Sequence, residues 1–507
     1  GIEDGPAADR TEPEAGSSLA EGEFPLAGRD YTDAEEYSVT AAELVEMIQD
    51  GTLEEGAVYE VSDHTSLYFG GINADTTYDL KGICIRTSPS GYSYDGPNPE
   101  QEGRFGIFVE GNGGVLTLQN FTMEISQWDE SDLEPEGAVN TWNCAGLTLE
   151  NVEITGTAGY GVHSSQGREG AETNLVNCRI EGSFRYGAVV FDDGMQAGAP
   201  SIVSSYVVNT AEPNVANWEG AQAVTDAISS GALIMDSVLE AEGAAVELRC
   251  SEAVVQNNTV TGGIALNAEL QNVLVALNEV TGGIAVPDGR NTVVLLNTAD
   301  EITVTGGVSI TLAENTVSGA VSATDVNYLL MQDNAVTGGI TTTGSENTYG
   351  DDLYDPTVRE ENGVNEDLLP KTNVEIFAGM EHKTSVRTAD ETLELQRYLS
   401  LSARNQTYGI VPPGLYTEDA LALAGVTDYS LYAYGVAVEF EEYESTVFTM
   451  NNCQDVTIYG LYISHELNAN GQGTVIEKGD GYVIIQTAPG YLPDLTDTHY
   501  YPDSGSL

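Results

Sequence analysis

The chain has 507 residues, with 80 Asp and Glu against 17 Lys and Arg, and a formal net charge of −63 at pH 7. A surface this acidic excludes nucleic acid and anionic membranes as partners, since both need a positive patch. No apolar run is long enough to span a bilayer. Charge repulsion on this scale favours salty or calcium-containing surroundings, so we treat calcium as an optional ligand. We expect no required cofactor.

Residues 1–36 form an acidic N-terminal arm that is rich in Gly, Pro, Ala and Glu, a composition typical of disorder. They resemble the tail that follows a cleaved export signal. We therefore expect an extracellular or cell-surface location, after removal of an export signal that is not present here. We expect the arm to lie against the body of the protein or a neighbouring copy, and to mediate self-association.

The segment at 37–51, YSVTAAELVEMIQDG, predicts an amphipathic helix. Thr40 and Glu43 have the spacing of a capping box, and Leu44, Met47 and Ile48 fall on one side. Such a helix would cap the open end of the repetitive region that follows, which we place at 37–345.

Asparagines recur in that region in steps of 20, 19, 18 and 19 residues, at Asn258, Asn278, Asn297, Asn315 and Asn334. Apolar residues stand three positions before and two after each one, and the phrase VTGGI or VTGGV recurs downstream. A short period of this kind means that each unit must stack on its neighbours to bury its apolar face. The sequence therefore predicts a β-solenoid with a structural asparagine ladder.

The earlier coils are longer than the later ones. The phrases LTLQNFTMEIS, LTLENVEITG and LVNCRIEG place Asn120, Asn151 and Asn177 on the same ladder, and Ser205 and Ser237 continue it. The extra residues must lie in loops that project from the corners. Loops of variable length on a rigid scaffold are where binding or catalysis is usually built.

Candidate chemistry lies in these longer coils, at 157–170 and 183–194. We expect neighbouring coils, about 4.8 Å apart, to bring onto one wall the catalytic candidates His163, Arg185, Asp192 and Asp193 and the carbohydrate-binding candidates Tyr160 and Tyr186. Two loop residues, Trp128 and Trp218, are further carbohydrate-binding candidates, because their rings could stack on sugars. Paired carboxylates suit a glycoside hydrolase, and Asp with Arg suits a calcium-assisted lyase. Successive Asp192 and Asp193 would point to opposite faces of a strand, however, so structural or calcium roles stay open.

The five cysteines contain no C-x-x-C and are odd in number, so neither a zinc site nor a full set of disulfides is predicted. Aligned with the coils, they fall where small buried residues belong. The linker at 346–387 is polar and holds Asp351, Asp352 and Asp355, which would serve a hinge or a calcium site.

A second module, 388–507, begins with TADETLELQRYLSLSA, where Thr388 and Glu391 predict another capped helix. The phrases PPGLYT at 412–417 and NCQDVTI at 452–458 resemble the opening coils of the pectate-lyase-like right-handed parallel β-helix superfamily. Residues 468–494 look like the start of the small barrel insertion of β-helical glycosidases. The resemblance covers most of 40–500 and implies an all-β fold of tandem right-handed parallel β-helices with N-terminal capping helices.

We expect the second module to be truncated, because related modules continue for many more coils. The catalytic signatures of polygalacturonases and of Arg-x-Pro-x-x-Arg lyases are absent. The sequence therefore favours an exported, rigid surface or filament-forming subunit over an enzyme. The alternative is a secreted carbohydrate-active protein that binds or cleaves a glycan, of the glycoside hydrolase or polysaccharide lyase type.

Overall fold

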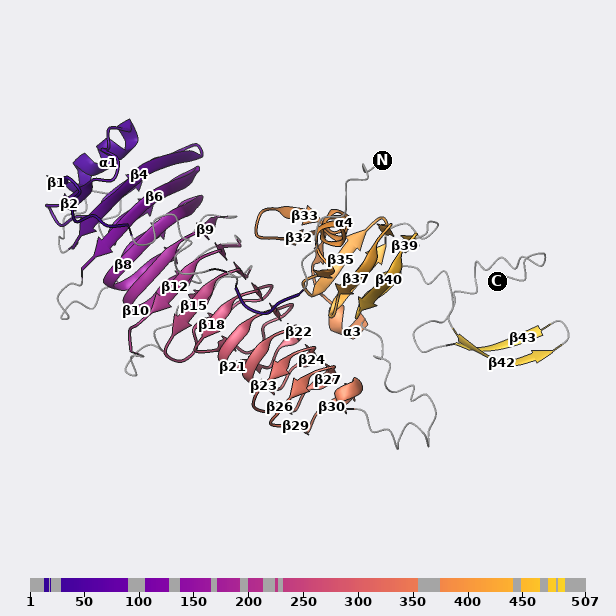
Figure 1. Cartoon of the computed structure of the whole chain (residues 1–507). Coiled ribbons are helices and arrows are strands. Elements are labelled where there is room, and N and C mark those ends of the chain that lie inside the picture. The colour runs from indigo at the N-terminus through magenta and orange to yellow at the C-terminus, as the bar shows by residue number, and fades with distance from the viewer. Residues whose placement is uncertain are drawn as a thin grey trace. The chain divides into compact units, whose positions relative to one another are not determined.

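The chain forms two compact units, one from Glu14 to Glu346 and a second that contains Asn347–Leu507. Figure 1 shows the elements of each unit, which are described separately below. The computed structural model describes residues 13–17, 19, 29–89, 105–126, 137–165, 171–191, 199–212, 224–226, 231–353, 374–440, 448–465, 473–479 and 482–487.

The first unit is a right-handed parallel β-helix, as the superfamily resemblance implies. Its 30 strands are linked by parallel pairing into one network that has three faces, here called sheets A, B and C. Six long strands bend through a corner and contribute to two or three of the faces: β4 (Thr76–Thr87), β6 (Val115–Ile125), β8 (Gly146–Ser165), β10 (Arg179–Phe191), β21 (Glu279–Pro287) and β23 (Thr298–Thr305).

The remaining strands belong to one face each. Sheet A contains β1 (Glu36–Val39), β2 (Val58–Val61), β12 (Tyr206–Asn209), β15 (Val238–Ala241), β18 (Thr259–Thr261), β25 (Thr316–Val317) and β28 (Ala335–Val336). Sheet B contains β3 (Leu67–Gly70), β5 (Phe105–Glu110), β7 (Gly137–Trp142), β13 (Val224–Asp226), β16 (Val246–Leu248), β19 (Ile264–Leu266), β26 (Val321–Thr324) and β29 (Ile340–Thr343). Sheet C contains β9 (Glu172–Val176), β11 (Ser201–Val203), β14 (Leu233–Met235), β17 (Val254–Gln256), β20 (Leu274–Ala276), β22 (Arg290–Leu295), β24 (Val308–Ala313), β27 (Asn327–Gln332) and β30 (Glu346–Tyr349).

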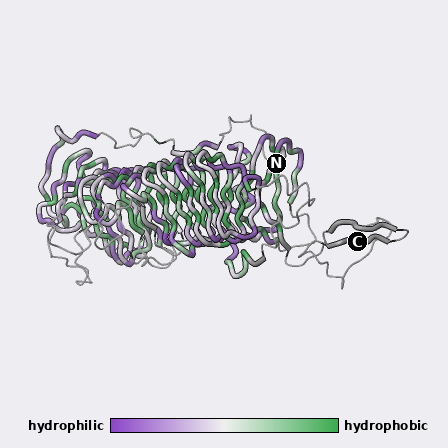
Figure 2. The backbone as a smooth tube through the Cα atoms, turned by 90° about the horizontal axis from the view of Figure 1, so that it is seen from below, coloured by the Kyte–Doolittle hydropathy of each residue, from purple (hydrophilic) through white to green (hydrophobic). Residues whose placement is uncertain are grey.

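Like residues stack on like residues along the core, as the period predicts. Val255, Val275, Val294, Leu312 and Met331 pair in register on successive strands of sheet C and are fully buried. Figure 2 shows this apolar character recurring from coil to coil. Because each coil covers its neighbour's apolar face, stability is shared along the stack.

The five later asparagines form a buried ladder between sheets C and A. Each Oδ1 from Asn278 to Asn334 accepts both the backbone N–H and the side-chain amide of the preceding asparagine, at 2.9–3.0 Å. Each amide also donates to a backbone carbonyl of sheet C in the coil before. Ser237 and Ser205 extend the ladder toward the N-terminus by accepting backbone N–H groups.

Asn120, Asn151 and Asn177 lie one position before the ladder, unlike the expected alignment. Their φ values are 62°, 55° and 52°, and Phe121, Val152 and Cys178 occupy the ladder positions. Asn tolerates this left-handed corner because its short polar side chain can hydrogen-bond locally. The same residue type therefore serves two neighbouring positions for different reasons.

The glycine pairs turn the corner between sheets A and B. Gly262 has a φ of 115°, and a Cβ there would lie 2.2 Å from Ala241 O. A side chain at this position meets backbone rather than open space.

Helix α1 (Ala41–Asp50) caps the first coil, and its Thr40–Glu43 capping box is confirmed. The buried face holds Ala41, Leu44, Val45 and Ile48. Met47 lies on the less buried side.

None of the five cysteines, all of which the structure describes, forms a disulfide bond; the four in the first unit are buried, whereas Cys453 in the second unit is partly exposed. Burial raises the pKa of the Cys178 thiol to about 12. These residues serve as small apolar side chains.

The second unit holds the first coils of another parallel β-helix. Three parallel sheets are formed by β31 (His382–Lys383), β35 (Gly414–Glu418), β38 (Val436–Phe440) and β41 (Tyr462–His465), by β34 (Tyr408–Ile410), β37 (Thr427–Tyr432) and β40 (Gln454–Tyr459), and by β36 (Leu421–Ala424) and β39 (Phe448–Asn451). Short helices are η3 (Asp351–Leu353) and α3 (Val374–Phe377). The capping helix α4 spans Leu395–Asn405 and buries Leu395 and Leu399.

The second capping box is not formed. Helix α4 has Glu394 at its N-cap with no side-chain cap hydrogen bond. Thr388 and Glu391 instead close the turn between β32 (Ser385–Arg387) and β33 (Thr392–Glu394), where Thr388 Oγ1 donates to Glu391 O at 2.7 Å. Within the expected barrel insertion, the described residues form one antiparallel pair, β42 (Gly473–Gly479) with β43 (Tyr482–Thr487).

Candidate functional site

The cluster expected from the sequence lies on the outer side of sheet B. The rings of Tyr160 and His163 are stacked with centroids 4.2 Å apart, and Tyr186 lies 5.1 Å from Tyr160. Arg185 places its guanidinium 5.5 Å from the Tyr186 ring centroid. A register shift between Phe184 and Gly187 pairs Tyr160 with Gly187, so the two tyrosines are neighbours without being equivalent.

These rings offer little surface to a ligand. Tyr160 is 4% exposed and His163 8% exposed. Asn140, the register partner of His163 on β7, is also buried, and its Oδ1 has no hydrogen-bond partner among the described residues. This face therefore holds a buried polar and aromatic cluster beneath the surface.

The structure describes only some of the other expected residues. Asp192, Asp193, Trp128, Trp218 and Asp355 lie outside the described residues. Asp351 and Asp352 begin the short helix η3. Across the described part of the chain, no group of three or more His, Cys, Asp or Glu residues is placed to hold a metal ion.

The outer face of sheet A carries a second, charged arrangement that the sequence reading missed. Arg179 on β10 lies between two carboxylates, with its Nε 3.7 Å from Glu153 Oε1 and 3.1 Å from Glu181 Oε2. The guanidinium also lies 5.0 Å from the ring centroid of Tyr206 on β12. We call Glu153, Arg179, Glu181 and Tyr206 the charged array.

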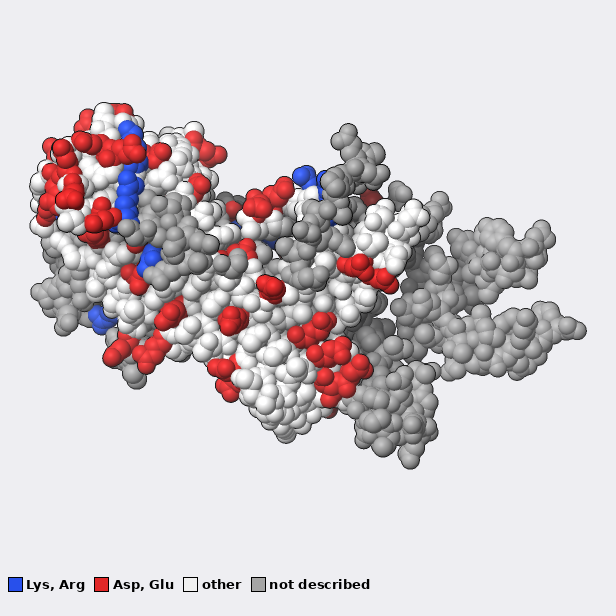
Figure 3. All heavy atoms as spheres, in the orientation of Figure 1, with Lys and Arg blue, Asp and Glu red and all other residues white. Residues whose placement is uncertain are grey.

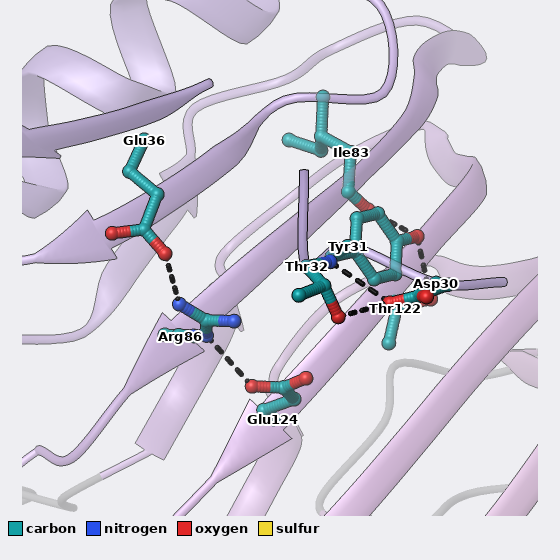
Figure 4. A network of polar contacts seen from close by, with 8 residues as sticks. All are labelled: Asp30, Tyr31, Thr32, Glu36, Ile83, Arg86, Thr122 and Glu124. Atoms are coloured by element: carbon teal, nitrogen blue, oxygen red, sulfur yellow. Dashed lines mark hydrogen bonds and ion pairs between the residues drawn. The ribbon is translucent and has the colours of Figure 1, made fainter. Parts of the chain in front are cut away.

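A second arginine is held in the same way three coils earlier. Arg86 Nη1 lies 2.7 Å from Glu36 Oε1, and its Nε lies 2.8 Å from Glu124 Oε2 (Figure 4). The hydrogen bonds that Arg86 donates to Glu124 and Glu36 raise the pKa of its guanidinium. Figure 3 shows basic side chains gathered in a narrow line at the N-terminal end of the first β-helix, among acidic ones.

A groove of about 330 Å³ opens beside Arg86 at the ends of the sheet A strands. Its polar lining includes Glu60, His64, Ser88 and Thr155 as well as Arg86, Glu124 and Ser126. His64 is exposed, and its Nδ1 lies 3.1 Å from Ser88 O. The groove therefore offers hydrogen-bonding groups at the surface, next to the charged array.

Burial changes the acid–base behaviour of the array. The Glu153 side chain is only 16% exposed, and desolvation raises the pKa of its carboxyl despite the opposing effect of Arg179. Glu181 is 37% exposed and takes part in the ion pair with Arg179. Glu153 thus holds a proton more readily than an ordinary glutamate does.

Glycoside hydrolysis commonly uses two carboxyl groups, one as the acid and one as the base or nucleophile. A carboxyl with a raised pKa is suited to donate a proton, and an ionised neighbour to activate water or attack. Of the two carboxyl groups beside Arg179, Glu153 has the raised pKa that suits a proton donor.

The signal for this array was present in the sequence as an alternation. Thr122–Glu124, Glu153–Thr155 and Arg179–Glu181 occupy the same two outward positions on successive coils. Aligning the coils on the inward residues Met123, Ile154 and Ile180 identifies these outward pairs.

The N-terminal arm lies against the wall of its own β-helix at this face. The Tyr31 hydroxyl lies 3.0 Å from Thr122 Oγ1 (Figure 4). Ser17 N–H donates to Thr259 Oγ1 at 3.0 Å, many coils away. Self-association through the arm stays a prediction.

No protein-family model and no curated protein matches the chain. Solved structures similar to it include a tailspike protein named Dettilon gp208, with 12% identity over 63% of this chain and 72% of that one, at a TM-score of 0.39. A PL6 family alginate lyase, AlyGC, has 11% identity over 85% of this chain and 71% of the lyase, with a TM-score of 0.28.

The catalytic domain of a GH87 α-1,3-glucanase, solved in complex with nigerose, has 11% identity over 86% of this chain and 69% of that domain, with a TM-score of 0.31. Among the described residues, no helix is both long enough and apolar enough to cross a membrane.

Proposed function

We propose that the first β-helix binds an uncharged glycan along the outer face of sheet A. The observation that carries this proposal is the charged array, in which Glu153, Arg179 and Glu181 from adjacent coils present hydrogen-bonding groups next to the Tyr206 ring. Charged side chains make strong hydrogen bonds to hydroxyl groups, and an aromatic ring supplies an apolar surface for a sugar face.

The charge balance supports an uncharged ligand. Arg86 and Arg179 each face two carboxylates, so both clusters have more negative than positive groups. A uronate would meet net repulsion there, whereas sugar hydroxyls can donate to carboxylates and accept from arginine.

The test is isothermal titration calorimetry with matched neutral and uronate oligosaccharides, with reducing ends measured in the same samples. We expect neutral glycans to bind, and Glu181→Gln or Arg179→Ala to weaken binding about tenfold or more, as loss of hydrogen bonds to a charged group does. Glu240→Gln is the matched control, because Glu240 occupies the same outward position as Glu181 two coils further along the β-helix and is exposed. Equal affinity in all variants, or no binding, contradicts the proposal.

A filament-forming subunit is the second candidate. Residues 231–353 form successive regular coils within the described part of the chain, which favours a rigid rod. Sedimentation of the full chain, and of the chain without residues 1–36, tests this reading. A monomer in both cases contradicts it.

A further inference from the structure

The arm contacts the outer face of sheet A at two separate places. At the first, Gly16 N–H donates to Leu277 O at 2.8 Å, and Ser17 Oγ donates to Asp236 O at 2.9 Å. Ser17 N–H also donates to Thr259 Oγ1 at 3.0 Å. We call Gly16 and Ser17 the distal anchor.

The second contact is a buried tyrosine. Tyr31 is 7% exposed, and its ring packs with Val58, Cys84 and Ala34. Its hydroxyl lies 3.0 Å from Thr122 Oγ1 and 3.2 Å from Gly82 O. Burial raises the pKa of this phenol, so it keeps its proton and can donate. We call Tyr31 the proximal anchor.

Both anchors lie on one row of register partners. The row runs through Cys84, Thr122, Glu153, Arg179, Tyr206, Val238, Thr259 and Glu279 on successive strands of sheet A. Three members of the charged array are in the middle of this row. The arm therefore occupies the row on both sides of the array.

We propose that the arm is an intramolecular strap that competes with the glycan for this row, a proposal that rests on the proposed function. With the proximal anchor docked, a ligand that reaches Glu153 cannot extend past Thr122. With the distal anchor docked, it cannot extend past Thr259. Four positions lie between the anchors, which at about 4.8 Å per coil is roughly 20 Å, whereas release of both anchors frees the eight positions of the row, about twice that length.

The strap is suited to release because its anchors are small. Among the described residues, three hydrogen bonds join Gly16 and Ser17 to the wall, at a partly buried site. The proximal anchor is a single side chain that is not part of any coil. Neither anchor belongs to a strand of a coil, so we expect the β-helix to keep its fold when both are released.

The experiment compares the full chain with Tyr31→Ala, Tyr31→Phe and Ser17→Ala for binding of a neutral trisaccharide and a neutral octasaccharide. If the strap is docked in about nine molecules of ten, its release tightens octasaccharide binding about tenfold, and trisaccharide binding changes little. Tyr31→Phe, which loses only the hydroxyl contacts, and Ser17→Ala should give smaller gains. Tyr37→Phe is the control, because the Tyr37 hydroxyl contacts Glu35 and Glu54 instead of the row.

A second readout follows the strap without a ligand. Cys84 is fully buried beneath Tyr31, and burial raises its pKa to about 12. Tyr31→Ala should make Cys84 react with a maleimide at least tenfold faster than in the full chain, as located by mass spectrometry, while Cys178 stays protected.

Each outcome is decisive. Octasaccharide binding that is equal in the full chain and in Tyr31→Ala overturns the strap and leaves the proposed function in place. Absence of binding by every form overturns the proposed function and the competition together. Unchanged protection of Cys84 in Tyr31→Ala also overturns the strap, whatever the glycan result.

Discussion

Substitution of Asn297 by alanine should weaken the β-helix sharply, because this residue lies in the middle of the buried ladder. Its Oδ1 accepts from the backbone N–H and the side-chain amide of Asn278, both at 2.9 Å. Its own amide donates to Val275 O at 2.9 Å and to Asn315 Oδ1 at 3.0 Å. Asn315 Oδ1 keeps its hydrogen bond from the backbone N–H of residue 297. Three groups therefore lose their partner at residue 297: the backbone N–H of Asn278, one side-chain N–H of Asn278, and Val275 O.

Each buried group left without a partner costs about 1–3 kcal/mol, so we expect the local free energy of opening to fall by about 3–5 kcal/mol. Asn297→Ser should cost about 1–2 kcal/mol, because a hydroxyl can still accept from the backbone above it. The chain itself uses this solution at Ser237, whose Oγ accepts from Ser205 N–H at 3.1 Å.

Native-state hydrogen exchange is the suitable assay, since repeat proteins do not unfold in one step. The backbone N–H of Asn278 is the direct reporter. Its protection from exchange should fall about a hundredfold or more in Asn297→Ala, as a loss of about 3 kcal/mol implies. Asn267→Ala, at an exposed position, is the control. Protection of Asn278 in Asn297→Ala that equals the wild-type value would refute the reasoning, because it would show that the ladder bonds carry no energy.

Four further predictions test other parts of the structure. Gly262→Ala should lower the free energy of unfolding more than Gly243→Ala does. Both glycines have left-handed φ values, but only at Gly262 would a Cβ meet backbone, 2.2 Å from Ala241 O. Urea unfolding of both variants measures the difference, and equal losses of stability would contradict the prediction. Thr40→Ala should cost about 1 kcal/mol of local stability in helix α1, read by hydrogen exchange against exposed Thr52→Ala; equal protection in the two variants would argue against a role for the cap. Desolvation raises the pKa of Glu153, so the contribution of this carboxyl to stability is present at low pH and is lost as pH rises through its folded-state pKa. Over that range, wild type should therefore lose stability relative to Glu153→Gln. A difference in stability between the two proteins that does not change with pH would contradict the prediction. Calcium should raise the melting temperature more than sodium at equal ionic strength, given the net charge of −63, and identical shifts would remove calcium from consideration.

The ladder and the coil length could be predicted because they repeat. Each of Val255, Val275 and Val294 has the same environment, so periodicity alone identifies the stacked positions. The earlier asparagines are misaligned by one residue because Asn is favoured both in a ladder and in a left-handed corner. Asn120 and Asn151 even hydrogen-bond to each other, at 3.1 Å, from the corner position.

The arm contacts could not be predicted from periodicity. Ser17 and Thr259 are 242 residues apart, and the arm has no repeat to align with the coils. The bulge after Phe184 likewise shifts Tyr186 from the place that sequence alignment gives it. Single insertions change register without leaving a pattern in the sequence.

The placement of the two arginines yields one more test of the proposed glycan binding. The Arg86 and Arg179 guanidinium groups are each held by two carboxylates, so they orient those carboxylates and do not attract anions. Recognition of an uncharged glycan at such groups uses hydrogen bonds whose strength depends little on screening. We therefore expect the affinity for a neutral oligosaccharide to change less than about twofold between 0.05 and 0.5 M sodium chloride, a range over which surface charge attraction is largely screened. Calorimetry across this range separates the two modes of recognition, because affinity that falls steeply with salt would show that the arginines bind an anionic ligand after all.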